Sequence, residues 1–182
     1  TKFDAERDVI ASQESRFGIE LDAVQLEAIH AALQNKVLII TGGPGTGKTT
    51  LVRFILGLMS RRIPSVALAA PTGRAAKRLT ETTSYQASTI HRLLEADNMG
   101  FQRNRDQPLE SELLIIDESS MIDTLLMDAL LDAISSSARL VREMPTMSVW
   151  AVCPSYRGVK RRRNSKIFIS FGNQTRNRLW KR

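Results

Sequence analysis

Eight consecutive residues in the first third of the chain have the types and spacing of a phosphate-binding loop. They fit the pattern G-x-x-x-x-G-K-[ST], in which glycines let several backbone N–H groups converge on phosphate oxygens. The lysine would place its charge on the β- and γ-phosphates, and the threonine hydroxyl would bind Mg²⁺. These residues are Gly42, Gly43, Pro44, Gly45, Thr46, Gly47, Lys48 and Thr49.

The segments on either side of the loop have the patterns that this chemistry requires. Residues 37–40 are all apolar, as in a strand buried on both faces of a parallel sheet. Residues 48–59 have apolar side chains at helical spacing, and the positive end of that helix would face the bound anion. The loop therefore predicts a nucleoside triphosphate site rather than a structural glycine-rich turn.

A pair of acids follows a second apolar run, at residues 113–116. Asp117 would hold Mg²⁺ through its water shell, and Glu118 would act as general base on the attacking water. Such a pair alone also fits a strand that ends in solvated acids. Together with the loop, it predicts Mg²⁺-dependent hydrolysis of ATP, with Lys48, Asp117 and Glu118 as the catalytic residues.

The order of apolar runs and amphipathic segments predicts an α/β fold with a mostly parallel sheet and helices on both faces. Residues 96–110 are polar and contain Gly100 and Pro108, so we expect a loop or small hairpin there. Asp22 is placed to cap the second helix. Strands are expected at 37–40, 66–69, 113–116 and 138–141, and helices at 4–16, 21–33, 48–59, 74–81, 89–94 and 123–134.

The composition and length narrow the class of protein. The 182 residues suffice for one α/β domain, and no apolar run approaches the roughly 18 residues that span a membrane. Cys153 is the single cysteine, which excludes a disulfide framework and favours a reducing, cytoplasmic location. The chain begins at Thr1 rather than Met, which is compatible with a start inside a longer protein.

Five segments follow one another in a fixed order along the chain: Gln25, Gly42 to Thr50, Ala70 to Leu79, Ser88 to Leu94 and Ile116 to Asp123. They resemble the motifs of the RecD-like DNA helicases, the 5′-to-3′ group of superfamily 1. The resemblance covers about residues 18–134 and implies the first RecA-like motor domain of such a helicase. It also implies ATP and Mg²⁺ as cofactors and single-stranded DNA as a partner. It further implies a second RecA-like domain, whose motifs are not found here, and it is compatible with nuclease-complex subunits as partners.

The resemblance also assigns roles to single residues. It gives Gln25 the recognition of adenine, which an amide suits because it both donates and accepts hydrogen bonds. It places DNA phosphates against two segments, with Pro71, Thr72, Gly73 and Arg74 in the first and Thr89, His91 and Arg92 in the second. Ordinary structural roles remain open: a polar helix face for Gln25, a helix N-cap for Thr72, a solvated basic face for Lys77 and Arg78, and surface or packing roles for His91 and His30.

The resemblance ends after Val141, where the family continues with Gly-Asp-x-Asp-Gln and this chain reads Arg142-Glu143-Met144-Pro145-Thr146. Residues 1–134 contain 14 basic and 18 acidic residues, whereas residues 135–182 contain 12 basic residues and one acid.

Codons for residues 142–145, read in a shifted frame, can encode Gly-Asp-Ala. A frameshifted tail is one hypothesis; a basic nucleic-acid arm at 160–163 and a plain solvated tail are the others. Residues 149–152 and 167–171 have strand-like composition.

These patterns lead to three hypotheses on function. The first is a fragment of an ATP-dependent DNA helicase of recombination or repair. The second is a nucleotide-gated nucleic-acid-binding module without motor activity, and the third is another P-loop ATPase. We expect a helical lead-in at 1–20, a truncated RecA-like domain at 21–141 and a basic tail at 142–182.

Overall fold

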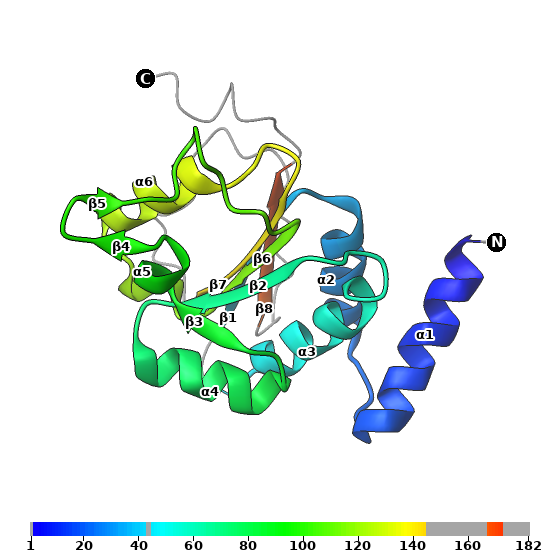
Figure 1. Cartoon of the computed structure of the whole chain (residues 1–182). Coiled ribbons are helices and arrows are strands. Elements are labelled where there is room, and N and C mark those ends of the chain that lie inside the picture. The colour runs from blue at the N-terminus through cyan, green and yellow to red at the C-terminus, as the bar shows by residue number, and fades with distance from the viewer. Residues whose placement is uncertain (1, 43–44, 145–166, 173–182) are drawn as a thin grey trace.

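A six-stranded sheet forms the centre of the computed structural model, which describes residues 2–42, 45–144 and 167–172 (Figure 1). Five strands are parallel, and the sixth, at the end of the sheet, pairs antiparallel with its neighbour. This arrangement confirms the mostly parallel α/β sheet expected from the sequence. The spatial order is β3 (Ala87–Thr89), β2 (Val66–Ala70), β6 (Leu113–Ile116), β7 (Arg139–Met144), β1 (Val37–Gly42) and β8 (Ile167–Gly172).

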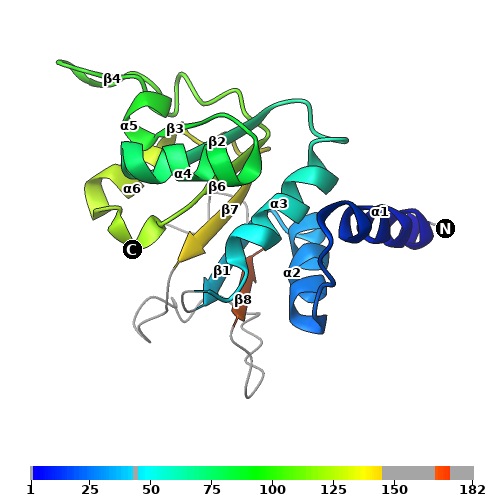
Figure 2. The same cartoon turned by 90° about the horizontal axis from the view of Figure 1, so that it is seen from below.

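Helices pack on both faces of this sheet (Figures 1 and 2). One face is covered by α2 (Ala23–Gln34), α3 (Lys48–Met59) and α4 (Gly73–Thr83). The other face is covered by α5 (Ile90–Leu93) and α6 (Thr124–Ala133). A further helix, α1 (Lys2–Phe17), packs on α3 and lies outside the layered core, as Figure 2 shows.

The central strand β6 shows why the apolar runs predict buried strands. Its four residues are fully buried. Leu113 and Ile115 pack in the cluster with α2, α3 and α4, whereas Leu114 and Ile116 pack in the cluster with α5 and α6. Successive side chains point to opposite faces, so a strand covered on both faces needs an apolar residue at every position.

The helix α2 begins at a complete capping box. The Asp22 carboxylate accepts hydrogen bonds from the backbone N–H groups of Val24 and Gln25, both at 2.8 Å. The Gln25 side-chain oxygen accepts in return from the Asp22 N–H at 3.0 Å. This reciprocal pair satisfies backbone donors that the first turn of a helix leaves free, and it confirms the predicted Asp22 cap.

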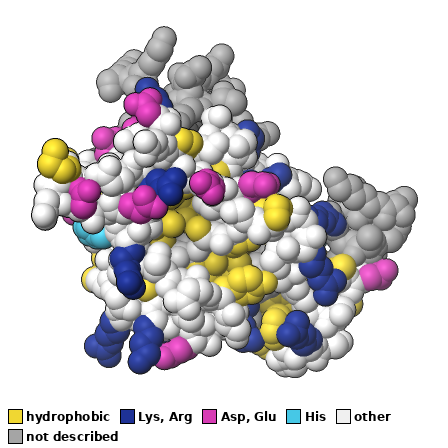
Figure 3. Space-filling model, viewed as in Figure 1, with side chains coloured by type: hydrophobic (Ala, Val, Ile, Leu, Met, Phe, Trp, Pro, Cys, Tyr) yellow, Lys and Arg dark blue, Asp and Glu magenta, His cyan; other side chains and the backbone are white. Residues whose placement is uncertain are grey.

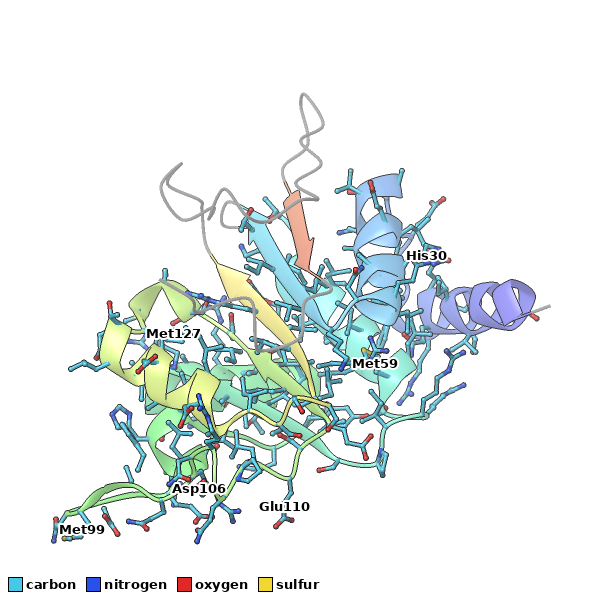
Figure 4. The ribbon with its side chains drawn as sticks, turned by 90° about the horizontal axis from the view of Figure 1, so that it is seen from above. His30, Met59, Met99, Asp106, Glu110 and Met127 are labelled. Atoms are coloured by element: carbon cyan, nitrogen blue, oxygen red, sulfur yellow. The ribbon has the colours of Figure 1, made fainter. Side chains whose placement is uncertain are left out.

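A two-stranded hairpin projects from the domain between α5 and β6, within the segment expected as a loop or small hairpin. It is formed by β4 (Ala96–Asp97) and β5 (Gly100–Phe101), and its tip carries Met99, which is 91% exposed and points away from the domain (Figure 4). Its base is held by Arg103, whose guanidinium lies 2.8 Å from the Glu95 carboxylate.

Three features of the sheet differ from the expected elements or extend them. β3 was not predicted, because its Ala-Ser-Thr sequence has no apolar run and it gains its place by pairing with β2. β7 continues to Met144, past the point where the motifs end. The strand expected at 167–171 is present as β8, whereas residues 149–152 lie outside the described part of the chain.

The division of the chain at residue 141 stays a prediction. No helix among the described residues is long and apolar enough to cross a membrane.

Candidate nucleotide-binding site

The carboxyl ends of three adjacent strands bring the predicted catalytic residues together. The phosphate loop follows β1, Asp117 follows β6, and β7 lies between these two strands in the sheet. In α/β sheets, ligands bind at this edge. The residues that meet there line a cavity of about 460 Å³: Gly45, Thr46, Gly47, Lys48, Thr49, Thr50, Arg78, Asp117, Glu118 and Glu143.

The described part of the phosphate loop has the backbone that its glycines permit. Gly45 and Gly47 have φ angles of +73° and +79°, in the left-handed region that favours glycine. Gly47 is also crowded, because a Cβ atom added to it would lie 2.9 Å from Nε2 of Gln25. Gly43 and Pro44 lie outside the described residues.

Lys48 is the first residue of α3 and is buried, with 9% of its surface exposed. Its ammonium group donates a hydrogen bond to the Gly42 carbonyl oxygen at 2.9 Å. The helix places its positive end at the same point. Lys48 thus holds its charge over the mouth of the loop, where a phosphate would bind.

The two acids after β6 lie on the same cavity. Asp117 donates its backbone N–H to the Ala69 carbonyl oxygen of β2 at 3.0 Å, and its carboxylate accepts from the Glu118 N–H at 2.7 Å. Glu118 has φ of +49°, an uncommon conformation for a residue with a side chain. The turn directs Asp117 and Glu118 toward the cavity that Lys48 and Thr49 also line.

The oxygen donors of this cavity fit Mg²⁺. Among the residues that the structure describes, no group of three or more His, Cys, Asp or Glu side chains could hold a metal ion alone. Mg²⁺ in phosphate sites takes one or two protein oxygens and completes its shell with phosphate oxygens and water. Thr49 and Asp117 are the oxygen donors here that suit this mode.

Glu143 is a member of the site that the sequence did not predict. It lies in β7 and is only 6% exposed, and its Oε1 atom lies 3.7 Å from Nζ of Lys48. The pKa of the Glu143 carboxyl is raised to about 8, by burial first and by the nearby Asp117 second, while Lys48 opposes the shift. The sequence offered one signal, because Glu143 is an acid just beyond the strand expected at 138–141. The change to a basic composition after that strand obscured this signal.

Gln25 borders the phosphate loop but is not among the residues that line the cavity. Its side-chain oxygen is engaged in the capping box of α2, and its amide nitrogen is the group that faces Gly47. The structure thus gives Gln25 a capping role, which differs from the polar helix face left open for it. The recognition of adenine by Gln25 stays a prediction.

The first segment expected to contact DNA lies at the carboxyl end of β2. Pro71 follows that strand, and Thr72 caps α4 by accepting a hydrogen bond from the Ala75 N–H at 3.2 Å. Gly73 and Arg74 are exposed at the start of this helix. Figure 3 shows Lys and Arg side chains gathered at the lower left, where α4 lies in Figure 1.

The second segment lies beside the first, because β3 pairs with β2 in parallel. Thr89 ends β3 and caps α5, with its hydroxyl accepting from the Arg92 N–H at 3.2 Å. His91 and Arg92 are exposed, and the His91 ring lies 6.0 Å from the Phe101 ring of the hairpin. The structure thus brings both segments to the sheet edge that also holds the cavity. His30 lies on α2, far from the hairpin (Figure 4).

Comparison with known proteins identifies the family. A model of the family described as AAA domain matches residues 25–142. The ATP-dependent RecD2 DNA helicase of Deinococcus radiodurans is 40% identical over 121 residues, which cover 66% of this chain and 17% of that protein. The RecBCD enzyme subunit RecD of Mycobacterium tuberculosis is 37% identical over 141 residues, which cover 64% of this chain and 24% of that protein. The chain thus spans less than a quarter of either relative.

A solved structure has the same fold. The Pif1 helicase from Candida albicans superposes with a TM-score of 0.57 and 25% identity, over 71% of this chain and 34% of that one. The parallel sheet with its phosphate loop is therefore the RecA-like P-loop fold that the motifs implied. The chain belongs to the AAA domain family, and within it the matched residues form a RecD-like helicase motor domain.

Proposed function

We propose that this chain is the ATP-hydrolysing motor domain of an ATP-dependent DNA helicase. One observation carries the proposal: Lys48, Thr49, Asp117 and Glu118 line one cavity, and that cavity shares a sheet edge with both segments expected to contact DNA. A motor needs this arrangement, since hydrolysis at one site must change the grip on a strand at the other.

The residues of the cavity divide the work of hydrolysis. Lys48 and the backbone N–H groups of the loop bind the β- and γ-phosphates, and Thr49 and Asp117 would hold Mg²⁺. When bound, Mg²⁺ neutralises charge that develops on the phosphates. Glu118 orients the attacking water and accepts its proton, a role that typically contributes about 10²–10⁴-fold in rate.

The DNA side of the domain is proposed to bind the sugar–phosphate backbone. The Arg74 guanidinium, the Gly73 N–H and the Thr72 hydroxyl are groups that bind phosphates without reading sequence. The exposed His91 ring is available to stack on a base. Binding of this kind is independent of sequence, as a protein that moves along a strand requires.

The full-length protein is proposed to act in DNA recombination or repair, in the cytoplasm. The Deinococcus relative is an ATP-dependent DNA helicase and the mycobacterial relative is a subunit of the RecBCD enzyme, which supports a role on DNA. A second RecA-like domain would close over the nucleotide and supply an arginine to the phosphates. By analogy with the RecBCD relative, nuclease subunits are the proposed partners. We expect the chain alone to bind Mg·ATP weakly, to hydrolyse it slowly and not to unwind DNA; robust unwinding would contradict this.

Three variants test the nucleotide and DNA roles in the chain as it exists. Titration with a fluorescent ATP analogue should show binding that Lys48→Ala abolishes. Glu118→Gln should retain that binding and lose about 100-fold in hydrolysis. Arg74→Ala should weaken the binding of labelled single-stranded DNA, measured by fluorescence anisotropy, without changing ATP affinity. ATP binding that is insensitive to Lys48→Ala would refute the assignment of the site.

The other two functions are distinguished by DNA-stimulated hydrolysis. In a longer protein that includes the second domain, stimulation by single-stranded DNA supports the motor, whereas its absence supports a nucleotide-gated binding module. Failure to bind single-stranded DNA, together with no effect of Arg74→Ala, supports another P-loop ATPase.

A further inference from the structure

The phosphate-binding lysine already has an anionic neighbour within the protein. Glu143 pairs in register with Ile40 of the strand that leads into the loop, and its side chain reaches the cavity. Its Oε1 atom lies 3.7 Å from Nζ of Lys48, and both side chains are more than nine-tenths buried. Once the pH exceeds the raised pKa of the Glu143 carboxyl, about 8, these two groups form an ion pair with little screening by water, so their attraction is stronger than at the surface.

The backbone of Glu143 is held firmly in this position. Its carbonyl oxygen accepts a hydrogen bond from the Ser119 hydroxyl at 2.6 Å, and Ser119 is fully buried. The same hydroxyl accepts from Nε of Arg142 at 2.7 Å. These bonds connect the end of β7 to the 3-10 turn η1 (Ser119–Met121). The Arg142 guanidinium donates to Ser119 and not to the Glu143 carboxylate.

The Glu143 carboxylate has an incomplete set of partners. Its second oxygen, Oε2, is buried and has no hydrogen-bond partner in the structure. The neighbouring Asp117 adds a second negative charge, and within the described part of the chain Lys48 is the cation that pairs with this carboxylate. A buried acid in this setting interacts unfavourably with any further anion that enters.

A triphosphate is such an anion, and it requires the same lysine. We propose that Glu143 competes with the triphosphate for Lys48 and thereby sets the affinity of this site for nucleotide. The inference rests on the proposed function, since it assigns a further residue to the same site. To bind the β- and γ-phosphates, the Lys48 ammonium must exchange its contact with Glu143 for contacts with phosphate oxygens, while the fixed β7 backbone keeps the carboxylate nearby.

The proposal is tested by removing the charge of the Glu143 side chain while keeping its shape. Glu143→Gln removes the negative charge and leaves a side chain of the same size. The affinity for a fluorescent ATP analogue is measured at about pH 9, above the raised pKa of the Glu143 carboxyl, so that this group carries its charge. Excess EDTA removes Mg²⁺, so that the phosphates meet the side chains directly. We expect the dissociation constant to fall about tenfold or more, which corresponds to about 1.4 kcal/mol. Glu110→Gln is the matched control, because this residue is 89% exposed at its side chain and lies outside the cavity; its affinity should equal that of the unaltered chain.

Second variants separate charge from folding and from the site itself. Glu143→Met, also neutral, should tighten binding in the same direction, and circular dichroism verifies that each variant is folded. If the unaltered chain binds nucleotide in a Lys48-dependent way and neither neutral variant binds it more tightly, the inference is wrong and the proposed function stands. If no variant binds nucleotide at all, both fail.

Discussion

The guanidinium of Arg78 lies 3.9 Å from the carboxylate of Glu118, so the basic helix α4 contacts the acid expected to act as general base. Both residues line the nucleotide cavity. The side chains are 72% and 36% exposed, so the pair is weak and easily exchanged for other partners. The contact joins the side of the domain expected to bind DNA to the side expected to hydrolyse ATP.

Arg78→Ala is predicted to raise the slow hydrolysis of ATP in the absence of DNA by about twofold or more. The reason is that the ion pair draws the Glu118 carboxylate toward α4, and removing the guanidinium leaves the carboxylate available to the attacking water. The same substitution should weaken the binding of single-stranded DNA and reduce its dependence on salt. Single-turnover hydrolysis and fluorescence anisotropy measure the two effects.

Lys77→Ala is the matched control for that prediction. Lys77 lies on the same helix, and its side chain is 80% exposed. It pairs with Glu81 and does not line the cavity. Its loss should weaken DNA binding and leave hydrolysis without DNA unchanged. Equal rates for Arg78→Ala and the unaltered chain would show that the contact with Glu118 has no part in hydrolysis.

Substitutions of Thr72 are predicted to separate its cap from its contact with DNA. The structure shows the cap, in which the hydroxyl accepts from the Ala75 N–H at 3.2 Å. Thr72→Ala should lower the free energy of unfolding by about 1 kcal/mol, and Thr72→Asn should restore it because asparagine caps equally well. If the hydroxyl also contacts DNA phosphates, only Thr72→Ser keeps full DNA affinity. Urea denaturation and anisotropy give the two readouts, and full DNA affinity in all three variants would exclude the contact.

The sequence predicted those elements whose signals are local. The helix expected at 48–59 and the strand expected at 113–116 have the bounds of α3 and β6. In both, a continuous pattern of apolar residues meets a sharp boundary: the glycine-rich loop before α3 and the acid pair after β6. The Asp22 cap is equally local, since its partners are two and three residues away.

What the sequence did not predict depends on residues far apart in the chain. Glu143 meets Lys48 only because β7 inserts between β1 and β6. Arg78 and Glu118 meet because the parallel strands β2 and β6 end at the same edge. No short-range pattern encodes such pairs, and the charged composition that follows Val141 directed attention away from the last residues of β7.

Gly47→Ala is predicted to disturb the phosphate loop by conformational strain and by displacing the Gln25 side chain, which takes part in the capping box of α2. Its φ of +79° costs an alanine about 1–2 kcal/mol, and the added Cβ would also lie 2.9 Å from Nε2 of Gln25. Gly18→Ala isolates the strain, because Gly18 has φ of +62° and open space around its Cβ position. Thermal denaturation and nucleotide titration should show a loss of both stability and binding for Gly47→Ala, and of stability only for Gly18→Ala. Equal losses of stability in the two variants would show that the contact with Gln25 adds nothing to the conformational strain.

The buried carboxyl of Glu143 is predicted to make the stability of the nucleotide-free chain fall as the pH rises. Its pKa is raised from 4.5 to about 8 by burial first and by Asp117 second. Between these values the folded chain keeps a proton that the unfolded chain has lost, so each rise in pH favours unfolding; below 4.5 and above about 8 this contribution is constant. Glu143→Gln cannot titrate, so its stability advantage over the unaltered chain should grow from pH 5 to pH 8. Urea denaturation at several pH values measures the difference, and a constant difference across that range would contradict the prediction.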